Sequence, residues 1–214
     1  MENESTSSPA EQENNGGLTA ETIHMEHGGA STVNATTLHL NHGGITTANA
    51  EDVHVSQGGV TTVNATNMTL RQGGMQTANA EHVVIRQGGV VRAQTERLDL
   101  LQAGAVVVQT NTANFTASSP GVVVASGDVQ LDQSGARVLV SKGSVSMDQG
   151  GSILTVANNV QMNNSGTVFL LARNVQGPVN TIFGQRESLL FGAVAGAVAW
   201  VLMMLASLAR RRKK

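Results

Sequence analysis

"ITTANAEDVHVSQGG" at residues 45–59 and "VTTVNATNMTLRQGG" at residues 60–74 are two versions of one repeated sequence. The pair Gly-Gly recurs at the same interval, beginning at residues 28, 43, 58, 73 and 88. A triplet of apolar, variable and apolar residues is more persistent and begins at residues 23, 38, 53, 68, 83, 98, 113, 129, 145, 160 and 175. A short fixed period of this kind is typical of an architecture in which each repeat packs on its neighbours.

Alternation of apolar and polar residues within each repeat predicts short β-strands, because successive side chains of a strand point to opposite faces. Val60 and Val63 are expected to face the interior, and Thr62 and Asn64 the solvent. One repeat is too short for a strand and a crossover helix. We therefore predict an all-β fold for residues 16–177, a parallel β-helix (solenoid) of about 11 coils with about 15 residues per coil.

Glycine and amide residues are expected at the corners of the coils. A corner needs a positive φ or a close approach of two backbones, and glycine allows both. Amide side chains at the same place in successive coils are expected to stack as hydrogen-bonded ladders. The two predicted ladders are Asn34, Asn49, Asn64 and Asn79, and Gln57, Gln72, Gln87 and Gln102.

The composition limits the core and the range of functions. The chain has 214 residues, of which 40% are hydrophobic but only 2% aromatic, so the core is expected to be narrow and without a ligand cavity. It has no cysteine, which excludes disulfides and thiolate metal sites. Residues 1–70 hold eight acidic residues and no Lys or Arg, so a nucleic-acid partner is not expected.

The two ends of the chain differ from the repeats. Residues 1–15 are acidic, lack an apolar run, and are expected to be a disordered tail with no secretory signal. After a linker at residues 178–188, residues 189–209 form an apolar segment without a charge. A helix of that length crosses the hydrocarbon layer of a bilayer, about 30 Å thick, so we predict one C-terminal transmembrane helix in contact with membrane lipid. Residues 210–214 form a basic tail.

The predicted span also carries signals for association and topology. Gly192, Gly196 and Ala199 make a face of small residues through which two helices can associate, which points to a homo-oligomer. The absence of an N-terminal signal favours a cytoplasmic solenoid, whereas the positive-inside rule favours an extracytoplasmic one. The flanking basic residues that decide the second alternative are Arg210, Arg211, Arg212, Lys213 and Lys214.

Histidines are the only candidate metal ligands that recur in register. His24, His39 and His54 are the middle residues of the first three triplets, and we expect them in one outward column about 4.8 Å apart. Imidazoles so placed are a candidate site for zinc, nickel or copper, or respond to pH by mutual repulsion. The alternative is a solvated column with no ligand. No nucleophile motif or phosphate-binding loop is present, so we expect neither an enzyme nor a cofactor.

Two further segments carry expectations. Threonine and asparagine alternate in Thr32/Asn34, Thr47/Asn49, Thr62/Asn64 and Thr77/Asn79, a pattern similar to the Thr arrays of insect antifreeze solenoids. Strand propensity alone also favours threonine there. Residues 168–171, "VFLL", are expected to cover the open lower end of the solenoid, whose last strand otherwise has unpaired backbone groups.

The coil followed by "LLARNVQGPVNT", an Ala/Gly-rich span and a basic tail resembles uncharacterised bacterial membrane-anchored β-solenoid repeat proteins. More loosely it is similar to bactofilins, cytoskeletal solenoids that stack into filaments but have longer coils and usually lack such a span. These features favour a membrane-anchored structural scaffold whose protein partner is unknown. The alternatives are a module that binds metal ions or a basic partner through the histidine column and the acidic distal end, and an end-to-end filament former.

Overall fold

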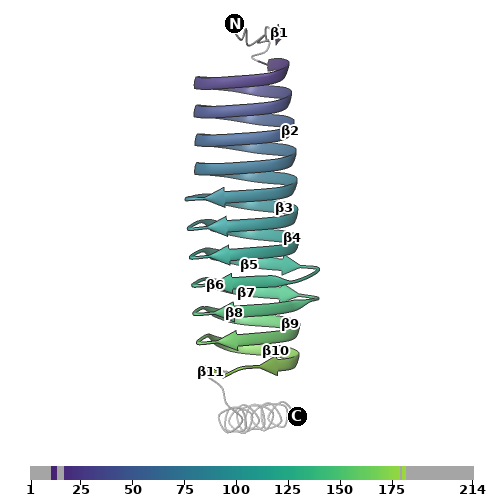
Figure 1. Cartoon of the computed structure of the whole chain (residues 1–214), viewed down its shortest axis with the longest axis vertical. Coiled ribbons are helices and arrows are strands. Elements are labelled where there is room, and N and C mark those ends of the chain that lie inside the picture. The colour runs from purple at the N-terminus through teal and green to yellow at the C-terminus, as the bar shows by residue number, and fades with distance from the viewer. Residues whose placement is uncertain (1–10, 14–16, 179, 182–214) are drawn as a thin grey trace, which may run out of the picture. The chain divides into compact units, whose positions relative to one another are not determined.

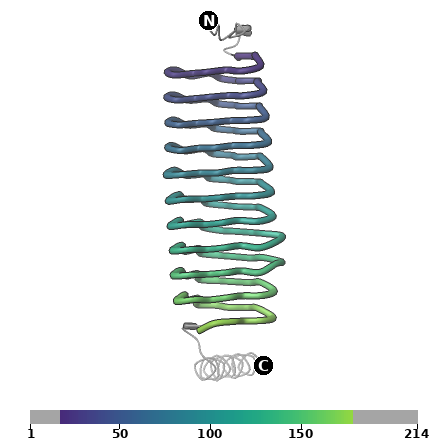
Figure 2. The backbone as a smooth tube through the Cα atoms, viewed as in Figure 1, coloured from purple at the N-terminus to yellow at the C-terminus, as the bar shows by residue number. Residues whose placement is uncertain are grey.

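The computed structural model describes residues 11–13, 17–178 and 180–181, which build an all-β parallel solenoid (Figure 1). The chain winds in one direction, so each turn lies on the turn before it (Figure 2). The strands are β1 (Glu11–Glu13), β2 (Gly17–Arg86), β3 (Gly88–Leu101), β4 (Gly104–Thr116), β5 (Ser119–Ala125), β6 (Val129–Asp132), β7 (Gly135–Ser141), β8 (Ser144–Asp148), β9 (Gly151–Asn163), β10 (Gly166–Gln176) and β11 (Asn180–Thr181). The predicted parallel β-solenoid is confirmed.

The register between strands reproduces the period of the sequence. Gly73 pairs with Gly88, one repeat further along the chain, and Val122 pairs with Val138, one residue beyond a full repeat. These registers join seven turns, which begin near Gly73, Gly88, Gly104, Ser119, Gly135, Gly151 and Gly166. The predicted length of one coil is therefore confirmed, while the predicted total number of coils stays a prediction.

The long strand β2 winds around the solenoid and is not straight. A straight strand of 70 residues would reach about 230 Å. Instead, side chains one repeat apart meet: the Asn49 amide donates to Asn34 Oδ1 at 2.9 Å, and the Gln57 amide to Gln72 Oε1 at 2.8 Å. The first repeats are therefore stacked at the same interval as the later ones.

The extra residue of the longer turns is accommodated at one corner. Strand β5 ends at Ala125 and β6 begins at Val129, and the corresponding loop joins β7 to β8. These loops project beyond the other turns (Figure 1). The Ser141 hydroxyl donates to the Gly127 carbonyl at 2.6 Å and accepts the Gly143 N–H at 2.9 Å, so the insertion is tied to the turn before it.

The core is a narrow stack of aliphatic columns. Val63, Leu38 and Leu70 are fully buried, and Phe115 is the single buried aromatic residue among the described residues. Asn64, between two inward residues, is exposed, and the outward Thr62 is partly buried. This alternation and the near-absence of aromatic residues confirm the expected narrow aliphatic core.

The expectation that residues 168–171 cover the lower end is wrong. They belong to β10, where Phe169 pairs with Leu154 and Leu171 with Val156. Because the side chains of a strand alternate, Leu170 packs against the core, while Phe169 is 55% and Leu171 67% exposed. The segment is thus a turn of the solenoid with apolar side chains on its outer surface.

The two termini contribute little to the described structure. Strand β1 pairs antiparallel with β2, Glu13 opposite Gly17 and Glu11 opposite Thr19, which satisfies backbone groups at the first turn. The other residues of the predicted disordered tail, the linker after residue 181, the span at 189–209 and the basic tail lie outside the described residues. Among the residues described, no helix is long and apolar enough to cross a membrane.

Candidate functional site

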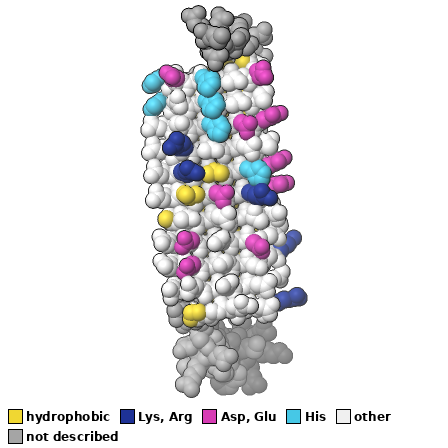
Figure 3. Space-filling view, viewed as in Figure 1, with side chains coloured by type: hydrophobic (Ala, Val, Ile, Leu, Met, Phe, Trp, Pro, Cys, Tyr) yellow, Lys and Arg dark blue, Asp and Glu magenta, His cyan; other side chains and the backbone are white. Residues whose placement is uncertain are grey.

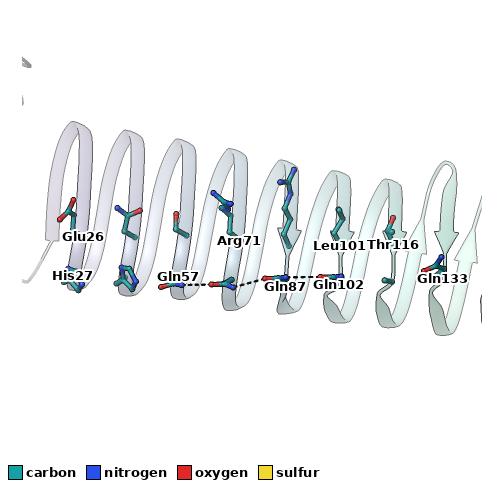
Figure 4. Close-up of a pocket in the computed structure, with 15 residues that line it drawn as sticks. Glu26, His27, Gln57, Arg71, Gln87, Leu101, Gln102, Thr116 and Gln133 are labelled. Carbon is teal, nitrogen blue, oxygen red and sulfur yellow. Dashed lines mark hydrogen bonds between the residues drawn. The ribbon is translucent and has the colours of Figure 1, made fainter. Parts of the chain in front are cut away.

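A groove with a volume of about 1020 Å³ runs along one corner of the solenoid (Figure 4). Its floor includes the predicted glutamine ladder. The Gln72 amide donates to Gln87 Oε1 at 3.1 Å, and the Gln87 amide to Gln102 Oε1 at 3.3 Å. Arg71 extends beside the ladder (Figure 4), and Arg86 also lines the groove. Together with the bond from Gln57, this confirms the glutamine ladder from Gln57 to Gln102.

The asparagine ladder lies on another side of the turns. The Asn64 amide donates to Asn49 Oδ1 at 2.8 Å, and the Asn79 amide to Asn64 Oδ1 at 3.0 Å. With the bond from Asn49 to Asn34, the predicted ladder is confirmed throughout. Each link pairs one N–H and one oxygen lone pair of an amide with its counterparts in the neighbouring turns, so the ladder reinforces the register.

His24, His39 and His54 form the outward column that their spacing predicts. The rings of His24 and His39 are 4.6 Å apart and 3° from parallel, and those of His39 and His54 are 5.0 Å apart and 13° from parallel. His27 and His42 form a second stack, at 5.0 Å and 4°. Histidines accordingly gather over the first turns of the solenoid (Figure 3).

The stacked geometry does not favour a metal ion. The lone pair of a ring nitrogen lies in the plane of the ring, so three nearly parallel rings direct their lone pairs side by side and not toward one point. Within the part of the chain that the structure describes, no group of three or more His, Asp or Glu side chains is placed to hold a metal ion. The metal site predicted at His24, His39 and His54 therefore receives no geometric support.

Within the histidine column, burial and the neighbouring histidines affect the protonation of His39. Burial lowers the pKa of His39 below its ordinary value of 6.5, and the positive charges that His24 and His54 can carry lower the pKa further. The physical cause is that a proton on the middle ring of a stack is poorly solvated and repelled from both sides. The neutral form of His39 is favoured in the folded state.

The corners change their chemistry along the solenoid, which the sequence analysis missed. In the first turns the positive φ belongs to glycine, as at Gly43 and Gly58. In later turns it belongs to the preceding residue: Gln87, Gln102, Ala117, Gln133, Gln149 and Asn164 have φ between 46° and 56°. The first glycine is lost at four of these six corners, where Ala103, Ser118, Ser134 and Ser165 occupy its place, but Gly88 and Gly150 follow Gln87 and Gln149, so the sequence gives no uniform signal.

One outer surface, here called the Thr/Val face, changes from polar to apolar along the solenoid. In the first turns it carries the pairs from Thr32/Asn34 to Thr77/Asn79. In the later turns two outward columns of β4, β5, β7, β9 and β10 continue it. They are Val107, Val122, Val138, Leu154 and Phe169, and Gln109, Val124, Val140, Val156 and Leu171. The end of the Thr/Asn alternation at Arg92 was the available sequence signal.

A second concave surface, of about 520 Å³, follows β6 and β8 on a different side of the later turns. Asn114, Gln130, Ser146 and Gln161 line it with amide and hydroxyl groups.

No family model, curated protein or solved structure matches this chain. The resemblance to bactofilins and to membrane-anchored repeat proteins is thus supported only at the level of the β-solenoid architecture.

The remaining predicted site residues lie in the C-terminal segment. The small-residue face at Gly192, Gly196 and Ala199 and the basic residues from Arg210 to Lys214 fall outside the described residues. Their proposed roles in helix association and membrane topology stay predictions.

Proposed function

We propose that this chain is a non-enzymatic structural scaffold, a rigid rod that presents repeated columns of side chains and is anchored to a membrane by residues 189–209. The observation that supports it is the continuous parallel register, in which each turn pairs with the next at an interval of one repeat. Each register fixes both the core columns and the exposed columns. The same kind of side chain is then presented at intervals of about 4.8 Å along the rod.

The anchor is supported by the sequence of the C-terminal segment. The uncharged segment at 189–209 matches the thickness of a bilayer when helical, and the basic tail after it is typical of a membrane boundary. We place the solenoid on the cytoplasmic side; the positive-inside rule favours the opposite side through the basic residues from Arg210 to Lys214, and protease accessibility decides between the two. Association of two spans through Gly192 and Gly196 would cluster rods on the membrane.

Fractionation and imaging test the two parts of this proposal separately. The full chain is expected in the membrane fraction and resistant to alkaline carbonate extraction, whereas a chain that stops after Ser188 is expected in the soluble fraction. Negative-stain images of the detergent-extracted full chain should show rods. Release of the full chain by carbonate would contradict the anchor, and compact globular particles would contradict the rod. Cleavage of the solenoid by protease added outside intact cells would contradict the cytoplasmic placement.

A second candidate function is recognition of a basic partner through the acidic first turns and the histidines beside them; the metal version of this candidate is the one that the ring geometry does not favour. The stack of His24, His39 and His54 places three imidazoles at regular intervals near Glu26, Glu51 and Asp52 in sequence. Calorimetric titration with zinc, nickel and copper decides the metal version. Equal heats for the native chain and for the His24→Ala, His39→Ala, His54→Ala variant would exclude it.

A further inference from the structure

The apolar half of the Thr/Val face exposes several large apolar side chains to solvent. Val107, Val124, Phe169 and Leu171 are 38%, 44%, 55% and 67% exposed, and Val106 and Ile153 beside them are 56% and 52% exposed. Exposed β-branched side chains occur singly on most proteins, but a contiguous patch marks an interaction surface. Between them the two columns continue through successive turns with partly buried residues, Val122, Val138, Val140, Leu154 and Val156, and the exposed Arg137 lies beside these columns.

The chemistry of the patch points to an apolar and regular partner. Val122 pairs with Val107 on one side and with Val138 on the other, so each column is a straight ridge of branched side chains. The rows repeat at about 4.8 Å, the spacing of paired strands. A surface with the same row spacing can place its ridges against these ridges over the whole length. A second copy of this chain supplies such a surface, because it has the same rows at the same spacing.

We propose that two copies of this chain pair in parallel through the Thr/Val face. The apolar rows alone cover roughly 300 Å², from five rows about 4.8 Å apart and a width of about 13 Å. A standard interface needs about 800 Å² per partner. The apolar rows by themselves are therefore too small for a stable pair.

Parallel alignment supplies the missing area with matched chemistry. When the two rods run in the same direction, the Thr/Asn rows of one copy also meet those of the other, with the single Arg92/Gln94 row between them and the apolar rows. The footprint between Asn34 and Leu171 then grows to roughly 600 Å², the lower end of the range for specific interfaces. An antiparallel pair either overlaps only in the apolar rows or places them against Thr and Asn. Parallel pairing also lets both chains leave their solenoids at the same end of the pair, although the proposal does not depend on the membrane anchor.

Charged substitutions on matched strands of the same turns test the interface. Val107→Asp with Val124→Asp lies on β4 and β5 in the Thr/Val face, whereas Gln130→Asp with Ser146→Asp lies on β6 and β8 on another side. Sedimentation of the full chain in detergent measures the dissociation constant of the dimer. Val107→Asp with Val124→Asp is expected to raise this constant more than about tenfold, since a buried unpaired carboxylate costs over 1.4 kcal/mol. Gln130→Asp with Ser146→Asp is expected to leave the dissociation constant unchanged. The two double variants are expected to have equal circular dichroism spectra.

Cysteine cross-linking tests the direction of pairing, because the native chain has no cysteine. Asn64→Cys and Leu171→Cys, far apart on the face, are each expected to form a disulfide with the same residue of the second copy, whereas Gln130→Cys is not. A monomeric native chain, a dimer that survives Val107→Asp with Val124→Asp, or equal cross-linking at Gln130→Cys would overturn the proposal. If the native chain is a monomer and the Leu171→Cys thiol does not react with a thiol reagent, we would assign residues 189–209 as the segment that covers the face. That result would also overturn the proposal of a second copy. Images of rods report on the scaffold independently.

Discussion

Gly58 shows how a single residue lets one turn lie on the next. Its φ is 154°, and a Cβ added there would lie 2.2 Å from the Gly43 carbonyl oxygen. Any side chain there must therefore push the two backbones apart at this corner. The recurrence of Gly-Gly in the sequence is explained by this contact, which is repeated between Gly58 and Gly73.

Gly58→Ala is expected to lower the free energy of unfolding by about 2–4 kcal/mol, because it combines backbone strain with overlap against a fixed carbonyl. Gly104→Ala is the matched control, since its Cβ would meet nothing within 4 Å. The control should change the free energy by less than about 0.5 kcal/mol. Thermal and denaturant unfolding followed by circular dichroism measures both, and equal losses would contradict this account of the corner.

His39 predicts a pH dependence whose sign follows from its neighbours. Because its pKa is lowered in the folded state, the unfolded chain binds more protons below about pH 6.5, and stability falls as the pH falls through that range. His39→Gln should flatten this dependence, since Gln130 and Gln161 occupy the same column in later turns. His82→Gln is the control, and a loss of pH dependence in it as large as in His39→Gln would contradict the role of the stack.

At the scale of the strand and its corner, the solenoid uses two different solutions. The first turns place the positive φ at glycine, whereas later turns shift it to the residue before this position, and three of them place a buried serine there: Ser118, Ser134 and Ser165. Ser134 is 3% exposed; its hydroxyl accepts the Ser118 N–H at 3.0 Å and donates to the Asp132 carbonyl at 2.8 Å. The serine thus satisfies backbone groups that the corner removes from the ladder.

Ser134→Ala is expected to destabilise the chain by about 1–3 kcal/mol, the cost of leaving the buried Ser118 N–H without an acceptor. Ser146→Ala, on an outward column of the next turn, should cost less than about 0.5 kcal/mol. Local hydrogen exchange of the Ser118 amide reports the effect directly. Unchanged protection of that amide in Ser134→Ala would contradict the assigned bond.

The strands and ladders were predictable from the sequence, but the second corner was not. Alternation at Val60, Thr62 and Val63 specifies which side chains are buried, and a fixed period specifies which residues stack. A positive φ at Gln87 leaves no such pattern, because glutamine is also suited to the ladder it joins. The exposed columns of the Thr/Val face were visible as residues but not as a surface, since their meaning depends on the register between distant repeats.

For the whole molecule, stacking makes the stability nearly one-dimensional. Each turn contacts the turns before and after it, so the loss of one turn at an end removes one interface, whereas the loss of a central turn removes two and separates the remaining solenoid into two pieces. Ile23 and Val108 are both core residues, at 4% and 0% exposure. They occupy the first described turns and the middle of the solenoid, respectively.

Val108→Asp is therefore expected to have a wider effect than Ile23→Asp, although each buries one carboxylate at a cost of about 3–5 kcal/mol. Hydrogen exchange with mass spectrometry should show protection lost only in the first turns of Ile23→Asp, but on both sides of residue 108 in Val108→Asp. The end variant can lose its damaged turns while the others stay paired. The central variant cannot, because its neighbours on both sides then expose new edges. Equal loss of protection throughout the chain in Ile23→Asp would show that the turns unfold as one cooperative unit and would contradict the nearest-neighbour account.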